Sequence, residues 1–381
     1  MTTFLLVIST LWLAYANGAN DNAKGVATLI GSRTLSARSA LRFAAVATFA
    51  GSVCTMMFAA SLVAAFGGKG LVPDALIDGT LFPLAVLLAA SATVMFATRL
   101  GMPVSTTHAM LGGLLGAGFA AAAGQVNTAQ LGGSFALPLL FSPIVAMLLT
   151  APLYLIGRRL RRASGLSEDS CLCVGTTEQA ISVQPNSASR TATAVVPPQQ
   201  APVLTVTTGK ADECDTGFNS TVARVRALGV LDGVHLFSGA ALSFARGTHD
   251  TAKVIGPLMI AGVLAPSYAS VLAGLAMAAG GLLSAGKVAR TMSEEITTMN
   301  EGQGTASNIV TSGMVILAGR FGLPVSTTHV SCGSLFGIRL VNGQAKGGAI
   351  GSILLAWVTT LPLAAGLSMA VYWVGQSWTG G

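Results

Sequence analysis

A six-residue motif, Pro-Val-Ser-Thr-Thr-His, occurs twice in this chain, at residues 103–108 and again at 324–329. A second motif precedes each copy: Gly-Ala-Asn-Asp-Asn-Ala-Lys at 18–24 and the related Gly-Thr-His-Asp-Thr-Ala-Lys at 247–253. The two motifs follow each other at nearly the same spacing in both halves. The duplication therefore predicts a fold of two related halves, in which the repeated polar residues form opposite walls of one site.

The sequence around these motifs is strongly apolar. Of the 381 residues, 52% are hydrophobic and only 9% are charged, whereas a soluble domain is about 25% charged. Apolar runs at 82–97, 131–156 and 353–374 approach the ~20 residues that a helix needs to span a bilayer. We therefore predict an all-α, polytopic membrane protein. The net charge of +7 does not predict nucleic-acid binding, because it follows from where the basic residues lie between the apolar segments.

Each half contains about five apolar segments. They lie roughly at 4–31, 43–66, 80–98, 103–123 and 134–157 in the first half, and at 232–262, 268–286, 303–319, 324–340 and 347–375 in the second. Residues 158–223 are rich in Ser, Thr, Pro and Gln, a composition that cannot bury a core. We predict a first membrane repeat at 1–157, a flexible linker at 158–223 and a second membrane repeat at 224–381.

The Lys and Arg residues predict the orientation, because cytoplasmic loops collect basic residues. With the N-terminus outside, only Lys69 and Arg320 fall outside apart from the motifs, and the linker is cytoplasmic. Each half then crosses an odd number of times, so the halves are inverted, as in alternating-access transporters. Segments 80–123 and 303–340 satisfy this parity either as full crossings or as re-entrant hairpins. We expect a multi-pass protein of the plasma (inner) membrane.

The Ser-Thr-Thr triplets are placed to begin helices. Gly101 ends the preceding helix, Pro103 cannot continue it, and Ser105 is a favourable N-cap for the next one. A helix N-terminus has unpaired N–H groups and a partial positive charge, which attract anions. Two such ends could cradle a tetrahedral anion with the hydroxyls of Ser105, Thr106, Thr107, Ser326, Thr327 and Thr328. Alternatively, these side chains only cap and pack their helices.

The first motif of each half places polar residues inside a long apolar segment, namely Asn20, Asp21, His249 and Asp250. Ionisable residues at membrane depth suggest function, and the glycines that flank them predict that these helices are broken at the motifs. A carboxylate beside an anion must be neutralised by a cation, a proton or a lysine, which predicts cation-coupled anion transport. In the alternative, each carboxylate only forms a structural ion pair with the lysine three residues later, Lys24 or Lys253.

Both motifs, in this order in each half, resemble the pattern of the inorganic phosphate transporter (PiT, or Pho-4) family, which is Gly-Ala-Asn-Asp followed by Gly-Leu-Pro-Val-Ser-Thr-Thr-His. The resemblance covers essentially the whole chain outside 158–223. It implies a homodimeric secondary transporter that takes up inorganic phosphate by symport with H⁺ or Na⁺, without a resident cofactor or metal. It implies a substrate site at Asn20, Asp21, Ser105, Thr106, Thr107, His249, Asp250, Ser326, Thr327 and Thr328. Cation coupling is expected at Asp21, Asp250, Asn20, Lys24 and Lys253.

The chain departs from the family pattern at three of these positions. Lys24 stands where the family often repeats Asn, and His249 stands where Asn is usual. Lys253 is similar to the residue in bacterial proton-coupled members. A tethered ammonium could occupy the place of a bound Na⁺, which favours H⁺, or a single Na⁺, as the coupling ion.

Three other functions remain open at this point. The same machinery could carry sulfate or another tetrahedral oxyanion, and a passive anion channel is the alternative from another class. Ser105, His108 and Asp21 include the residue types of nucleophilic catalysis. Because every element is duplicated, we expect a symmetric binding site and not an enzyme.

Overall fold

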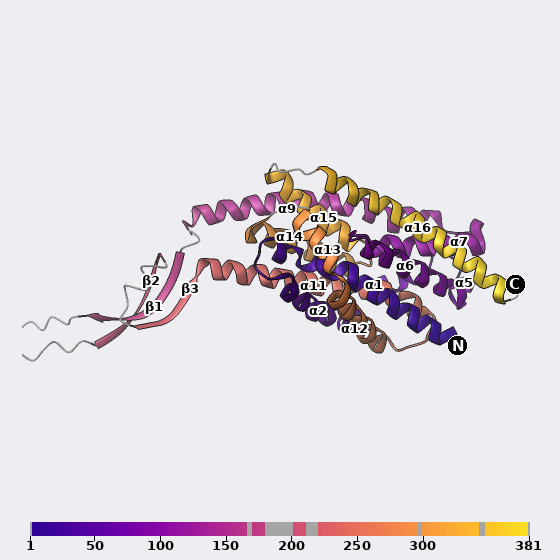
Figure 1. The fold of residues 1–381 in the computed structure, drawn as a ribbon, viewed down its shortest axis with the longest axis horizontal. Helices are drawn as coiled ribbons and strands as arrows, with labels where there is room; N and C mark the ends of the chain where they lie inside the picture. The colour runs from indigo at the N-terminus through magenta and orange to yellow at the C-terminus, as the bar shows by residue number, and fades with distance from the viewer. Residues whose placement is uncertain are drawn as a thin grey trace, which may run out of the picture. The chain divides into compact units, whose positions relative to one another are not determined.

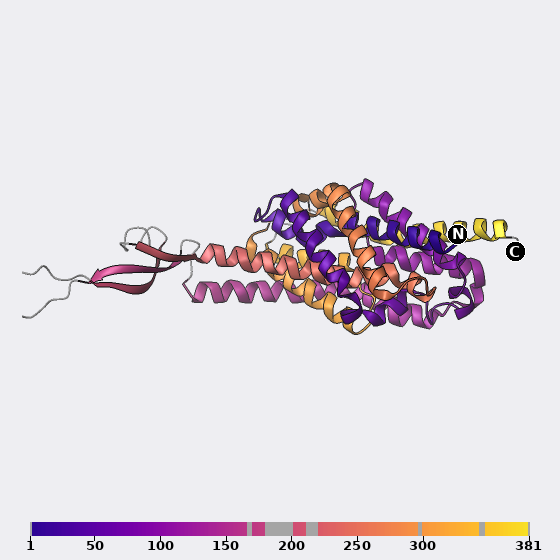
Figure 2. The same cartoon turned by 90° about the horizontal axis from the view of Figure 1, so that it is seen from below.

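The computed structural model describes residues 2–165, 170–179, 201–210, 220–295, 299–342 and 347–379. The chain forms two compact units, one made of Met1–Gly157 with His235–Gly381 and the other of Arg158–Val234. The first unit is a bundle of helices, and both ends of the chain lie at the same end of it (Figures 1 and 2).

The helices follow the predicted order of apolar segments in both halves. Those of the first half are α1 (Thr2–Gly31), α2 (Ala37–Val53), α3 (Thr55–Phe58), α4 (Ala60–Phe66), α5 (Asp74–Ile77), α6 (Leu81–Arg99), α7 (Thr106–Ala122), α8 (Thr128–Gln130) and α9 (Leu137–Ala163), with a 3-10 turn at Ala123–Gln125 and a π-helical stretch at Leu131–Ala136. Those of the second half are α11 (Ala227–Ile260), α12 (Pro266–Ser284), α13 (Gly286–Arg290), α14 (Glu301–Arg320), α15 (Thr327–Asn342) and α16 (Gly347–Thr379), with a π-helical stretch at Thr291–Glu295.

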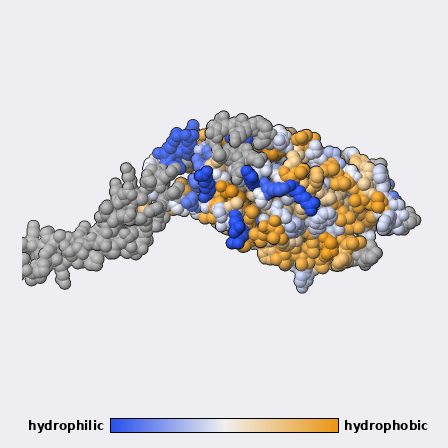
Figure 3. All heavy atoms as spheres, in the orientation of Figure 1, coloured by the Kyte–Doolittle hydropathy of each residue, from blue (hydrophilic) through white to orange (hydrophobic). Residues whose placement is uncertain are grey.

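The surface of the helical unit is apolar. Among the described residues, four helical stretches are long and apolar enough to cross a membrane: Leu81–Arg99, Thr128–Ala163, Pro266–Ser284 and Gly351–Trp378. Large side chains point outward from them, with Phe141 of α9 55% exposed and Val358 of α16 72% exposed. Figure 3 shows hydrophobic residues spread over the displayed face of this unit. Such a surface suits contact with lipid, which confirms the prediction of a helical, multi-pass membrane protein.

The chain breaks between α6 and α7 and again between α14 and α15. Gly101 and Gly322 follow the ends of α6 and α14 with positive φ angles of 76° and 67°, a left-handed conformation that glycine adopts without strain. The next helices start with the predicted caps, because Ser105 accepts from the N–H of His108 and Ser326 accepts from the N–H of His329, both at 3.2 Å. Two helix N-termini are thus held inside the bundle.

α1 and α11 run through their motifs without interruption, which corrects the prediction that these helices are broken. The glycines instead allow close helix contact. A Cβ on Gly18 would lie 1.9 Å from the carbonyl oxygen of Met277 in α12, and a Cβ on Gly247 would lie 2.2 Å from that of Thr48 in α2. Small residues let membrane helices approach in this way. The two contacts correspond, since each joins the motif helix of one half to the second helix of the other.

The second unit contains a three-stranded antiparallel sheet. Its central strand β1 (Ser170–Gln179) pairs with β2 (Ala201–Lys210) on one side and β3 (Ser220–Arg226) on the other. The prediction of a flexible linker at 158–223 did not include these strands, although the Thr and Val residues of β2 favour an extended chain. The cytoplasmic location of this segment stays a prediction.

Candidate functional site

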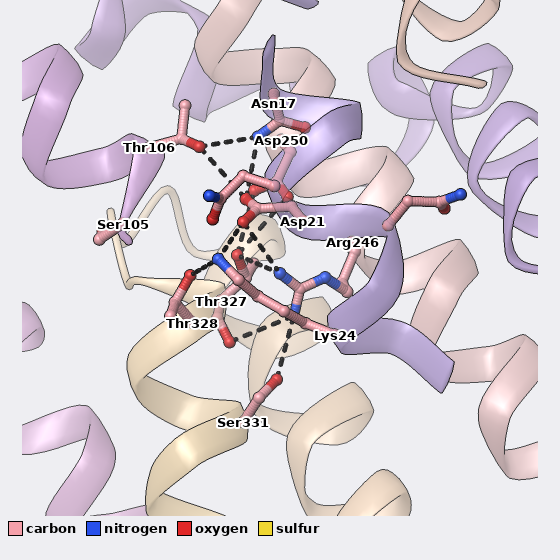
Figure 4. A network of polar contacts seen from close by, with 12 residues as sticks. Asn17, Asp21, Lys24, Ser105, Thr106, Arg246, Asp250, Thr327, Thr328 and Ser331 are labelled. Carbon is pink, nitrogen blue, oxygen red and sulfur yellow. Dashed lines mark hydrogen bonds and ion pairs between the residues drawn. The ribbon is translucent and has the colours of Figure 1, made fainter. Parts of the chain in front are cut away.

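The motifs of both halves meet inside the helical unit, where α1 and α11 face the first turns of α7 and α15 (Figure 4). Each substrate-site residue expected from the sequence is at most 2% exposed, a set that comprises Asn20, Asp21, Ser105, Thr106, Thr107, His249, Asp250, Ser326, Thr327 and Thr328. Lys24 and Lys253 are equally buried. Charged groups are costly to bury unless they are paired and hydrogen-bonded, so the contacts of these residues describe the site.

Two reciprocal hydrogen bonds join the break before α7 to the break before α15. The Thr107 hydroxyl donates to the carbonyl oxygen of Val325 at 3.2 Å, and the Thr328 hydroxyl donates to that of Val104 at 2.9 Å. Each threonine thus holds the extended residues before the helix of the other half. The two Ser-Thr-Thr segments therefore lie against each other, as the duplication predicts.

Asp21 is the centre of the first-half motif. Lys24 donates to Asp21 Oδ1, and the Thr106 hydroxyl donates to Oδ2 at 3.2 Å. The Lys24 ammonium also donates to the Val104 carbonyl at 2.6 Å and to the Thr328 hydroxyl at 2.7 Å. One ammonium therefore contacts a carboxylate, a carbonyl and a hydroxyl oxygen, which come from both halves.

Asp250 is the centre of the second-half motif. Lys253 donates to Asp250 Oδ1 at 2.7 Å, and the Thr327 hydroxyl donates to the same oxygen at 3.3 Å. His249 Nδ1 lies 3.8 Å from this oxygen, which is too far for a hydrogen bond. Both Asp–Lys pairs of the structural alternative are thus present, and in each half the carboxylate also contacts the first threonine of a helix.

Ser105, Ser326 and Asn20 are among the expected residues that form no hydrogen bond with the carboxylates of Asp21 and Asp250. The hydroxyls of Ser105 and Ser326 cap their helices. Asn20 instead secures the break after α6, because it donates to the Thr98 hydroxyl at 2.9 Å and accepts from the N–H of Val104 at 3.1 Å. These three residues therefore fix the backbone around the charged side chains of Asp21, Lys24, Asp250 and Lys253.

In α1 and α11, two residues of the network were not among the expected ones. Arg246 donates to Ser331 Oγ at 3.0 Å, and its Nη2 lies 3.7 Å from Asp21 Oδ1. Asn17 donates to Asp21 Oδ2 at 3.0 Å and to the Thr106 hydroxyl at 2.9 Å. Both precede the first glycine of a motif. An arginine inside an apolar helix is itself a signal of function, and it could have identified Arg246 from the sequence.

A buried cluster of charged side chains within a lipid-facing helical bundle is typical of a site that binds or conducts ions and polar substrates. The family model described as "Phosphate transporter family" matches residues 17–368, and the chain belongs to this family. This membership confirms the resemblance that the two motifs indicate. The family is one of transporters, which argues against an intramembrane enzyme.

Similar proteins cover nearly the whole chain. A putative phosphate permease of Pyrococcus abyssi is 25% identical over 97% of this chain and 96% of its own length. A probable low-affinity inorganic phosphate transporter of Bacillus subtilis is 26% identical over 98% of this chain and 96% of its own. Among solved structures, one described as "The sodium-dependent phosphate transporter" covers 99% of both chains with a TM-score of 0.74 at 23% identity. That similarity shows a shared fold.

Proposed function

We propose that this protein is a secondary active transporter that takes up inorganic phosphate together with a cation. The anion is held between the N-termini of α7 and α15, beside Asp21 and Asp250. The observation that carries this proposal is the convergence of both Ser-Thr-Thr segments on both Asp–Lys pairs within hydrogen-bonding distance. Helix N-termini and hydroxyl groups are suitable ligands for a tetrahedral oxyanion. Membership of the phosphate transporter family supports the choice of phosphate.

We infer that the two halves are inverted repeats and that they alternate access to this site. Corresponding glycine contacts support the inference. A Cβ on Gly112 of α7 would lie 2.3 Å from the Leu361 carbonyl oxygen of α16, and a Cβ on Gly333 of α15 would lie 2.3 Å from the Pro143 carbonyl oxygen of α9. The two chain ends lie at the same end of the bundle (Figure 1), which fits the even total number of crossings that two equal halves make.

For the coupling ion, we propose H⁺ in preference to Na⁺. The Lys24 ammonium contacts oxygens of a carboxylate, a carbonyl and a hydroxyl, which are the ligand types that a hard cation takes from proteins. Lys253 neutralises Asp250 in the same way. With both carboxylates neutralised by tethered ammonium groups, transport does not require Na⁺ for charge balance. The solved relative of the same fold is described as sodium-dependent, so the two proteins are proposed to differ in this respect.

We further propose that the protein is a homodimer of the plasma (inner) membrane, with residues 158–223 on the cytoplasmic side. The distribution of Lys and Arg supports this orientation. The dimer is an expectation from the family.

The substrate is tested by uptake of radiolabelled phosphate into proteoliposomes, with unlabelled phosphate or sulfate as competitor. We expect saturable uptake that phosphate suppresses and an equal concentration of sulfate does not. Suppression by sulfate alone would assign the site to another oxyanion. Uptake that rises linearly with concentration would favour a channel.

A further inference from the structure

Arg246 has an unusual environment for a buried guanidinium group. It is 2% exposed, on α11, one helical turn before Asp250. Its Nη1 donates to Ser331 Oγ at 3.0 Å and to the Thr327 carbonyl at 3.4 Å, and its Nη2 donates to the Thr327 hydroxyl at 3.3 Å. Its Nε forms no hydrogen bond with any residue that the structure describes. The group thus points at the first turns of α15 and has an unused donor (Figure 4).

Neither Asp21 nor Asp250 forms a hydrogen bond with this guanidinium. Charge-assisted N–H···O bonds are typically about 2.7–2.9 Å long, whereas Arg246 Nη2 lies 3.7 Å from Asp21 Oδ1. That oxygen already accepts from Lys24, and Asp250 pairs with Lys253. Among these five side chains, three carry a formal positive charge and two a negative one, which leaves one positive charge in excess. A net charge inside the bundle is costly, and an anion would balance it.

We propose that Arg246 is a substrate-binding residue, whose guanidinium pairs with the phosphate at the N-terminus of α15. This inference rests on the proposed function. The planar fork of arginine matches two oxygens of a phosphate group, and the Thr327 hydroxyl lies beside it as a further ligand. In this proposal the phosphate binds on the side of the guanidinium that faces Asp21, where the nearest carboxylate oxygen is 3.7 Å from Nη2. Arg246 then supplies, in addition to the two ammonium groups, a positive charge that balances the bound phosphate.

Comparison with Asn17 shows that the additional positive charge of Arg246 belongs to one wall of the site. Asn17 holds the same motif position in the first half as Arg246 in the second, directly before the glycine. Asn17 donates to the Thr106 hydroxyl as Arg246 donates to the Thr327 hydroxyl. A neutral amide thus occupies one wall and a cation the other. The anion is therefore bound asymmetrically, closer to α15 than to α7.

The test compares Arg246→Gln and Arg246→Lys with a control, Arg320→Gln, in the full-length protein. Arg320 lies exposed in the last turn of α14. Uptake of radiolabelled phosphate by proteoliposomes gives KM and the maximal rate, and stabilisation of the purified protein by inorganic phosphate reports binding separately. We expect Arg246→Gln to raise KM at least about tenfold, the loss typical of a charged hydrogen-bond partner. Arg246→Lys, which keeps the charge, is expected to raise it less, and the control stays within about twofold of wild type.

A merely structural role would lower the amount of folded protein and the maximal rate and would leave KM unchanged. Wild-type uptake with a KM for Arg246→Gln within twofold of wild type would overturn the inference and leave the proposed function intact. No phosphate uptake by the wild type would refute the proposed function and the inference with it. If Arg246→Gln does not fold, Ser331→Ala decides, because it removes the 3.0 Å contact that orients Nη1. An increase in KM of about threefold supports the inference, and an unchanged KM contradicts it.

Discussion

The hydroxyl of Thr328 donates a hydrogen bond to the carbonyl oxygen of Val104, 2.9 Å away in the other half of the chain. The Lys24 ammonium donates to both of these oxygens, so it is held by α1, by the break before α7 and by α15 at once. Any movement of one half relative to the other must change these contacts. This junction is therefore both the proposed ligand site and the place where the proposed alternating-access movement would act.

Removing either carboxylate charge is predicted to abolish coupled uptake. Asp21→Asn and Asp250→Asn each leave a buried lysine without its ion-pair partner, which disturbs the cluster without changing its size. We expect phosphate uptake by proteoliposomes to fall to the background of empty liposomes, while the variants still insert into the membrane and purify. Near-normal uptake by both variants would exclude the role assigned to these residues.

The capping serines are predicted to act on stability more than on affinity. Ser105→Ala and Ser326→Ala each remove the acceptor for one N–H of the following helix, which typically costs ~1 kcal/mol. Thermal unfolding of the purified variants measures this loss. Since each hydroxyl is already engaged with an N–H of its own helix, the KM for phosphate should change little, and a large rise in KM with normal stability would show that the serines bind the anion.

Close helix packing at the first motif gives a prediction with an internal control. Gly18→Ala places a methyl group 1.9 Å from a backbone carbonyl of α12, so the helices must move apart, at a cost of about 1–3 kcal/mol or more. Gly313→Ala in α14 meets no atom within 4 Å and should stabilise that helix by less than ~1 kcal/mol. Equal thermal stability of the two variants would contradict the packing of α1 against α12.

The second unit is predicted to be dispensable for transport, because the charged cluster lies wholly within the first unit. Deleting residues 165–215 should leave the KM for phosphate and the uptake rate per folded protein unchanged. Comparison with the full-length chain in the same proteoliposome assay tests this. A loss of uptake in a stably folded deletion variant would give the segment an active part in transport.

The sequence was sufficient to predict which motifs meet, because duplication within an apolar chain leaves few other ways to bury polar residues. The caps at Ser105 and Ser326 and the two Asp–Lys pairs follow from local geometry and could be predicted as well. The continuity of α1 through its motif could not be predicted from the sequence. Whether Gly18 breaks a helix or packs it depends on whether Met277 lies against it, and that contact joins distant parts of the chain.

The contacts of Arg246 illustrate a second limit of the sequence, although the residue itself could be recognised there as a candidate. Arg246 lies one residue before the motif, so an interpretation confined to the motif leaves it out. Its contacts with Thr327 and Ser331 depend on how α11 crosses α15. The excess positive charge of the site becomes visible only when these helices are placed together.

The most informative single measurement is the accumulation of radiolabelled phosphate in proteoliposomes under an inward H⁺ gradient and, separately, under an inward Na⁺ gradient. We predict accumulation above equilibrium under the H⁺ gradient and no additional uptake with Na⁺. The Asp21→Asn variant should lose the H⁺-driven accumulation. Phosphate that only equilibrates across the membrane under either gradient would contradict a coupled transporter. Accumulation driven by Na⁺ alone would contradict the part assigned to Lys24 and Lys253.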